Sequence, residues 1–473
     1  MSPLTKSQLH RQAEQLVDFV NKSPSPFHVV DVCRKWLRSA QFTELKEKQS
    51  WEGTIQPNGR YFFTRNGSSL VAFSVGGKFR PGNGVSAVGA HTDSPCFKLK
   101  PVSRKTSSGF LQVGVQVYGG GLWHTWFDRD LSVAGRVMVK DTNGGYTSRL
   151  VAIEEPIMRI PSLAIHLDRS LSDGIKFNKE THLTPILATV SKALNGTKTD
   201  ESPKVSEAKK PAHHPILLER IAKELNVSVS DIFDFELCLY DTQKAVIGGI
   251  CNEFIYSARL DNLNSSYCAI EGLINSLADG PTNTDPHIRL VALFDNEEVG
   301  STSAYGANSA LIESALRRVH ESFDNCGKSC FEASIANSYL ISSDVTHAVH
   351  PNYSEKHEEN HRPELNKGPA IKINANQRYA TTAVTSTILK DIASRHDIPI
   401  QEFVVRNDSS CGSTIGPMLS AQLGLRTVDI GNPLLSMHSI REICGTDDVG
   451  MKVKLFEKFF KEFSVLDAKI FAD

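Results

Sequence analysis

The chain has 473 residues, a length that corresponds to two or three domain-sized units. Forty per cent of its residues are hydrophobic and 22% are charged, which is the composition of ordinary soluble globular proteins. Its 52 basic and 53 acidic side chains give a formal net charge of −1. The chain therefore lacks the excess of positive charge that would attract a nucleic acid or an anionic membrane. We therefore predict no nucleic-acid partner and no membrane partner.

Targeting and cysteine patterns indicate the compartment. No apolar run approaches the ~18 residues that a transmembrane helix needs. The first twenty residues are polar and amphipathic and lack the apolar segment of a secretory signal. The nine cysteines are odd in number and scattered, so they imply no disulfide framework. We predict a reduced, cytoplasmic protein.

The N-terminal part predicts a helix followed by strands. Apolar residues recur at steps of three and four over residues 9–20, which is typical of an amphipathic helix. The proline-containing segment 21–26 is predicted to end it. Short apolar runs bounded by glycines then predict strands over 70–75 and 84–90, and the second strand leads directly into His91.

The middle of the chain predicts a β-rich region. Predicted strands cover residues 113–118, 132–139 and 150–154. The segment 195–214 is polar, carries charges of both signs and has few large apolar residues, so we predict that it is flexible. A helix is predicted over 216–225, and a further element begins near Ser230.

From about Gly248 onward, strands alternate with helices. Predicted strands cover 289–294, 339–342, 403–406 and 427–430, and predicted helices cover 267–277, 309–318, 382–395 and 453–463. Such alternation favours a mostly parallel sheet covered by helices. We predict one α/β domain made of residues 1–95 and 245–473, interrupted by a β-rich inserted domain over 96–244.

Histidine and acidic side chains follow several of these predicted strands. They are His91 and Asp93, Asp295 with Glu297 and Glu298, Asp344, Asp261 before a helix, and His438 after the strand 427–430. Ligands of open α/β sheets bind at the carboxyl ends of strands, so we expect these groups to converge.

Two histidines and three carboxylates without cysteine suit Zn²⁺, Co²⁺ or Mn²⁺ in a catalytic site. A two-metal site also needs a carboxylate that stays off the metals as a general base. Glu297 and Glu298 can divide the roles of base and ligand, because successive residues leaving a strand point in different directions. Asp93 is placed to accept the second ring N–H of His91.

Each fragment alone also has an ordinary explanation. A His-x-Asp pair is commonly a surface pairing, residues 295–298 fit a solvated loop, and Asp344 fits a helix cap. The four histidines between 347 and 361 fit metal storage or a loop that lines an active site. Cys411 fits a buried structural thiol better than a nucleophile. The ligand pattern alone also suits a dinuclear deacylase or carboxypeptidase.

Seven segments, in order along the chain, resemble the aspartyl aminopeptidase branch of the M18 family of metalloaminopeptidases. They are GAHTDSP (89–95), RLDN (259–262), DNEEVGS (295–301), SSDVTHAVHPNY (342–353), KHEENHRP (356–363), NDSSCGSTIGP (407–417) and MHSIRE (437–442). The resemblance implies an α/β catalytic domain with an inserted β-rich dimerisation domain, and two zinc ions per subunit.

The resemblance also implies roles for individual residues. Asp261 would bridge the zinc ions, with His91 and Asp344 on one, Glu298 and His438 on the other, and Glu297 as general acid and base. The family removes N-terminal Asp or Glu from peptides. The residues that match its substrate contacts are Lys372 and Tyr379 for the acidic side chain, His347, and His166, which is offered to a neighbouring subunit. The family forms tetrahedral twelve-subunit particles.

Two other functions stay open. One is an M18 enzyme that prefers neutral N-termini, as the vacuolar branch does; that branch carries an N-terminal propeptide that we do not find in this sequence. The other is an assembly scaffold with incidental chemistry, which the complete set of matching ligands disfavours.

Overall fold

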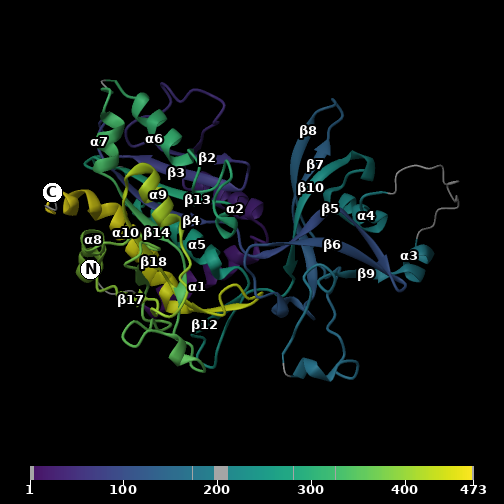
Figure 1. The fold of residues 1–473 in the computed structure, drawn as a ribbon. Coiled ribbons are helices and arrows are strands. Elements are labelled where there is room, and N and C mark those ends of the chain that lie inside the picture. Colours follow the sequence, from purple (N-terminus) through teal and green to yellow (C-terminus); the bar gives the residue numbers. More distant parts are fainter. Residues whose placement is uncertain (1–4, 173, 197–210, 281, 325, 471–473) are drawn as a thin grey trace. The chain divides into compact units, whose positions relative to one another are not determined.

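The structure is a computed structural model of the chain (Figure 1). It describes residues 5–172, 174–196, 211–280, 282–324 and 326–470. Residues 197–210, most of the segment predicted to be flexible, therefore lie outside the described residues. The chain divides into two compact units, the first made of Met1–Ser94, Ala245–Met437 and Arg441–Asp473, the second of Pro95–Lys244 and His438–Ile440.

A nine-stranded sheet forms the centre of the first unit. Its strands, in spatial order, are β1 (Thr43–Glu44), β2 (Arg60–Arg65), β3 (Ser69–Val75), β13 (Ile288–Phe294), β4 (Val85–His91), β14 (Tyr339–Ser343), β18 (Arg426–Gly431), β16 (Ala370–Ile373) and β17 (Gln401–Val404). Among the described residues, five of the eight neighbouring pairs are parallel and three are antiparallel. The predicted α/β class with a mostly parallel sheet is confirmed.

Helices surround this sheet (Figure 1). They are α1 (Lys6–Asn21), α2 (Pro26–Ser39), α5 (Leu260–Ser276), α6 (Leu311–Glu321), α7 (Cys330–Ala336), α8 (Ala383–Arg395), α9 (Ile415–Leu423) and α10 (Thr446–Asp467). Every residue of β3, β4, β13 and β14 is buried, as expected for central strands covered on both faces. Along β13, Val291 and Leu293 pack into one hydrophobic cluster, whereas Leu290 and Ala292 pack into another, so the sheet separates two cores.

Most predicted elements of this unit are confirmed with shifted ends. Helix α5 begins at Leu260, seven residues before the predicted start, and β17 ends at Val404 rather than Arg406. The predicted end of the first helix within 21–26 is confirmed, since α1 ends at Asn21, and Pro26 then begins α2 with Ser25 as its N-cap. Proline is compatible with the first helical turn, where its missing N–H has no partner to lose.

A second, smaller sheet of the first unit was not predicted. Its strands are β11 (Val246–Gly248), β12 (Phe254–Ser257), β20 (Glu442–Gly445), β19 (Pro433–Leu435) and β15 (Thr346–His347). All five strands are short, so none gives a clear alternating pattern in the sequence. Strand β12 leads into α5 and therefore into Asp261.

The second unit contains a six-stranded antiparallel sheet. Its strands, in spatial order, are β8 (Tyr146–Ala152), β7 (Leu131–Lys140), β10 (Ile232–Asp241), β5 (Cys96–Ser107), β6 (Phe110–Tyr118) and β9 (Ile186–Thr189), and its helices are α3 (Val190–Gly196) and α4 (Pro215–Leu225). Phe97 stacks on Trp123 with ring centroids 4.8 Å apart in the core of this unit. The predicted strands β6, β7 and β8 and the predicted helix α4 are confirmed. None of the helices that the structure describes, in either unit, has the length and hydropathy of a membrane span.

Candidate metal centre

The predicted acidic and histidine residues of the first unit meet at the carboxyl ends of its central strands. Strand β4 ends at His91, which is paired in register with Phe294, the last residue of β13. The Nε2 atom of His91 lies 3.3 Å from Oδ1 of Asp261, and 3.8 Å from both Oε2 of Glu297 and Oδ1 of Asp344. Two three-residue groups made only of described residues of the first unit can therefore hold a metal ion here, His91–Asp261–Asp344 and His91–Glu297–Glu298. The structure thus brings together five residues from four separate segments of the chain.

Hydrogen bonds from neighbouring elements fix the start of α5 under this cluster. The hydroxyl of Ser94 donates to the carbonyl oxygen of Asp261 over 2.5 Å, and the N–H of Asp261 donates to Oε2 of Glu442 over 3.1 Å. Asn262 donates from Nδ2 to the carbonyl oxygen of Ser343 at the end of β14, over 2.9 Å. The side chain of Asp261 is consequently held between the ends of β4 and β14.

Asp93 contacts more of the site than the sequence predicted. The Nδ1 atom of His91 lies 3.1 Å from the carbonyl oxygen of Asp93 and 3.4 Å from its Oδ1, so Nε2 is the ring atom that faces the cluster. The two carboxylate oxygens of Asp93 also accept the backbone N–H groups of Glu297 and Glu298, each over 3.1 Å. One buried carboxylate therefore orients the imidazole and the adjacent glutamates together.

The cluster carries an excess of negative charge. Burial alone would lower the pKa of His91, but its contacts with Asp261, Asp344 and Asp93 raise that pKa well above its ordinary value. Burial raises the pKa of Glu297 to about 8; the charge of His91 opposes this rise and the nearby aspartates add to it. Imidazole and carboxylate oxygens around a shared centre are the donors that zinc binds in catalytic sites, so these residues fit a divalent metal.

Lys372 is the cationic side chain beside this cluster. It lies on β16, is 3% exposed, and places Nζ 3.9 Å from Oδ2 of Asp344. The same Nζ lies 5.3 Å from the centre of the Tyr379 ring, and Tyr379 is also buried. A buried ammonium next to an aromatic ring is a suitable counter-charge for a carboxylate that enters from solvent.

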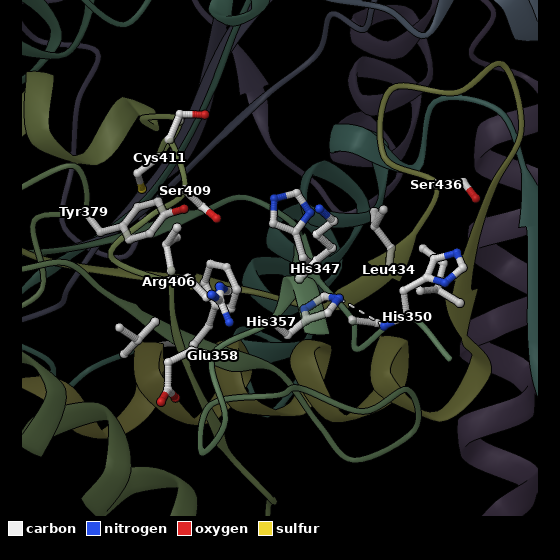
Figure 2. Close-up of a pocket in the computed structure, with 18 residues that line it drawn as sticks. His347, His350, His357, Glu358, Tyr379, Arg406, Ser409, Cys411, Leu434 and Ser436 are labelled. Atoms are coloured by element: carbon white, nitrogen blue, oxygen red, sulfur yellow. Dashed lines mark hydrogen bonds between the residues drawn. The ribbon is translucent and has the colours of Figure 1, made fainter. Parts of the chain in front are cut away.

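Tyr379 and His347 line a cavity of about 320 Å³ (Figure 2). Its other labelled lining residues are His350, His357, Glu358, Arg406, Ser409, Cys411, Leu434 and Ser436. The backbone N–H of His350 donates to Nε2 of His357 over 3.1 Å. In the described parts of the chain, the metal-binding groups do not include the histidines of 347–361, so the arrangement favours a loop that lines a site over metal storage.

The cavity also contains Cys411 and two residues that the sequence analysis did not single out. Cys411 packs against the cluster of Tyr379 and Phe403, but it is half-buried and lines the cavity rather than being fully buried as predicted. Arg406 and Ser409 line it as well. The signal available in the sequence was the polar run that directly follows the predicted strand 403–406, because such a run at a strand end belongs to the edge where ligands bind.

Two predicted site residues belong to the second unit. His166 lies on an exposed turn of that unit. His438 belongs to its short segment His438–Ile440, and its Nδ1 lies 3.0 Å from the carbonyl oxygen of Gly120. The cluster described above is therefore built from residues of the first unit alone.

Comparison with known proteins identifies the family. The family model described as "Aminopeptidase I zinc metalloprotease (M18)" matches residues 19–460. The chain belongs to the M18 family. M18 proteins are zinc metalloproteases, so this chain is a zinc-dependent hydrolase, and zinc is the metal that its donor set fits.

Its M18 relatives match it along nearly its whole length. An aspartyl aminopeptidase of Aspergillus oryzae is 51% identical and covers 98% of both chains, and one of Dictyostelium discoideum is 52% identical, covering 96% of this chain and 97% of its own. Among solved structures, a complex of Ape4 with Nbr1 has a TM-score of 0.95 and 46% identity, covering 100% of this chain and 90% of the other. The mApe1 dodecamer of S. cerevisiae has a TM-score of 0.85 and 34% identity, covering 97% and 98%.

Proposed function

We propose that this M18 protein is an aspartyl aminopeptidase, which hydrolyses the first peptide bond of substrates with an unblocked N-terminal Asp or Glu. The observation that carries the proposal is Lys372, a buried cation 3.9 Å from an oxygen of the metal cluster. A substrate whose first peptide bond lies at the cluster would place its first side chain within reach of that ammonium. The names of the relatives support the same substrate class.

Two zinc ions are proposed at the centre. His91 and Asp344 would hold one, Glu298 and His438 the other, with Asp261 between them, as the resemblance to the family implies. Zinc bound there would supply Lewis-acid polarisation of the peptide carbonyl and a water of lowered pKa.

The protein's own groups then perform the remaining tasks. Glu297 accepts the proton of the attacking water on its carboxylate and returns it to the leaving amine, a role that suits a buried carboxyl that this proposal does not assign as a zinc ligand. Lys372 pairs with the side-chain carboxylate of the substrate, and Tyr379 packs beside that pair. His347, on the cavity wall, is positioned to contact the substrate backbone.

We further propose that the second unit is a dimerisation domain and that His166 completes the site of a neighbouring subunit. The mApe1 dodecamer among the solved relatives supports a homo-oligomer, and a tetrahedral twelve-subunit particle is the form we expect. A reducing cytoplasmic location is part of this proposal, and the odd number of scattered cysteines, which implies no disulfide framework, supports it.

The test is a set of initial rates on matched peptides that begin with Asp, Glu, Leu or Ala, using protein stripped of metal and then restored with zinc. We expect zinc-dependent activity confined to Asp and Glu. A preference for Leu would retain the metallopeptidase and overturn the acidic substrate class. Absence of activity in assembled, zinc-loaded protein would favour the scaffold function instead.

A further inference from the structure

Two loops come together over the strand that carries Lys372. One is the segment 374–382 after β16, which contains Tyr379, and the other is the segment 405–414, which contains the cavity residues Ser409 and Cys411. The Nε atom of Arg378 donates to the carbonyl oxygens of Cys411 and Gly412, over 3.2 and 3.3 Å. The two loops thus form one wall of the cavity (Figure 2).

Asp429 lies directly behind this wall. It is on β18, is fully buried, and is paired in antiparallel register with Lys372. Residues paired across neighbouring strands project on the same side of a sheet. The carboxylate of Asp429 therefore lies on the same face of the sheet as the ammonium of Lys372.

The two oxygens of this carboxylate bind one loop each. Oδ2 accepts the backbone N–H of Ala380, the residue after Tyr379, over 2.6 Å. Oδ1 accepts the hydroxyl of Thr414 over 2.5 Å. In addition, the backbone N–H of Asp429 donates to the hydroxyl of Thr381 over 3.0 Å. Asp429 is thereby the shared hydrogen-bond partner of both loops.

The neighbouring sequence fits this role. Thr414 is the N-cap of α9, and its hydroxyl also accepts the N–H of Gly416 over 3.3 Å. A Cβ at Gly416 would lie 2.5 Å from Oδ2 of Asp429, so only glycine lets the start of α9 approach the carboxylate this closely. The close approach therefore depends on two residues, the buried carboxylate of Asp429 on β18 and Gly416 on α9, which has no side chain.

We propose that Asp429 is the positioning residue of the acidic-substrate pocket: its carboxylate fixes Tyr379 and the 405–414 loop in place against Lys372. It touches neither the substrate nor the metals, and it acts by holding the residues that do. This inference rests on the proposed function, because it assigns Asp429 to the pocket that selects Asp and Glu.

The test compares Asp429→Ala with Asp429→Asn in the full-length, zinc-loaded protein. The asparagine can accept from Ala380 with its oxygen and donate to the Thr414 hydroxyl with its amide, so it retains both contacts without the charge. The alanine loses both. We expect Asp429→Ala to raise KM for Glu-peptides about tenfold, with kcat within about twofold of the wild type, and Asp429→Asn to restore KM to near the wild-type value.

Three results would overturn the proposal. The first is an unchanged KM in Asp429→Ala. The second is an equal loss in both variants, which would make the charge rather than the two contacts decisive. The third is an equal fall of kcat on acidic and neutral peptides, as general structural damage would produce. If Asp429→Ala does not fold, Thr414→Val decides, because it removes the contact to Oδ1 and the N-cap hydrogen bond of α9 but keeps the contact between Asp429 and Ala380; we expect KM to rise about threefold, and no change overturns the proposal.

The wild-type protein separates this test from that of the proposed function. If the wild type shows no preference for Asp and Glu over Leu and Ala, both the proposed function and the inference about Asp429 are contradicted. If the wild type shows that preference and Asp429→Ala retains its KM, only the inference fails.

Discussion

The metal cluster lies next to the proposed acidic-substrate pocket, which Lys372, Tyr379 and the 405–414 loop form. The two regions are stabilised differently. The cluster gathers five carboxylates, those of Asp93, Asp261, Glu297, Glu298 and Asp344, around the imidazole of His91. The pocket instead contains one buried ammonium and hydrogen-bonded loops that Asp429 joins. The cluster therefore depends on an added cation, whereas the pocket is complete without one. Perturbing the two regions should give different and separable effects.

The largest expected effect comes from removing the metal. Dialysis against a chelator should reduce activity by about a thousandfold or more, because the Lewis acid and the activated water are lost together. The melting temperature should also fall, since an ion that binds only the folded state stabilises it. Activity assays and calorimetry with and without added zinc measure both. Full activity after verified metal removal would contradict the assignment of the centre.

The next effect distinguishes the two adjacent glutamates. Glu297→Gln should lower kcat by about 10²–10⁴-fold while the zinc content stays unchanged, because Glu297 is assigned as general base. Glu298→Gln is the matched control and should lose zinc, because Glu298 is assigned as a ligand. Elemental analysis and kinetics on the same preparations measure the zinc content and kcat of each variant. Zinc loss in Glu297→Gln together with retained zinc and a low kcat in Glu298→Gln would exchange the two roles.

Substitutions in the pocket should change KM without any loss of zinc. Lys372→Ala is expected to raise KM for Asp- and Glu-peptides by about 10–100-fold, because the substrate carboxylate would be buried without a counter-charge. Lys356→Ala is the control, since Lys356 lines the cavity but is exposed, and it should change KM less than about twofold. Equal losses on Leu-peptides would show that Lys372 does not select the acidic side chain.

A substitution at Asp93 tests whether its carboxylate orients the metal-binding residues. In Asp93→Asn one of the two backbone N–H groups of Glu297 and Glu298 would face an amide NH₂ instead of an oxygen. We expect zinc affinity to fall about tenfold, as for other residues that orient metal ligands. Competition with a chromogenic chelator measures this. An unchanged zinc affinity would limit Asp93 to a structural role.

The smallest effect concerns Lys452, a buried cation outside both regions. Its Nζ lies 2.7 Å from Oγ of Ser265, and burial lowers its pKa to about 8. The unfolded chain, with a lysine pKa near 10.5, binds this proton more tightly. Between about pH 8 and 10.5 the unfolded chain therefore holds this proton while the folded protein does not. The stability contributed by neutral Lys452 is fully present above about pH 10.5, decreases as the pH falls, and is lost once the pH has fallen through about 8.

Denaturant unfolding between pH 8 and 10.5 checks this, with Lys452→Met as the reference. The wild type should gain stability relative to the variant as the pH rises. A constant difference between the two proteins would contradict the lowered pKa.

The sequence predicted the cluster better than the pocket. His91, Glu297 and Asp344 all follow predicted strands, so the rule that ligands bind at strand ends groups these three. Asp261 precedes a predicted helix, and the strand β12 that leads to it was not predicted. The second contact of Asp93 was not predictable, because it depends on the register between β4 and β13. Lys372 and Tyr379 came only from the resemblance to a family, since a lysine in a short strand leaves no local pattern. Asp429 was missed for a different reason, since it lies inside the predicted strand 427–430 and its hydrogen-bond partners come from loops that the sequence does not place.

Strand β4 lies between β13 and β14, although both of these strands come about 200 residues or more after it in the chain. At about 5–20 residues per second, a ribosome takes roughly 10–40 s to reach the first of them. During that time a nascent strand whose residues are all buried in the folded protein has neither of its neighbours, and residues 95–244 of the second unit are synthesised first. A premature stop before β13 is therefore expected to yield an aggregation-prone fragment without any metal centre, rather than a weakened enzyme.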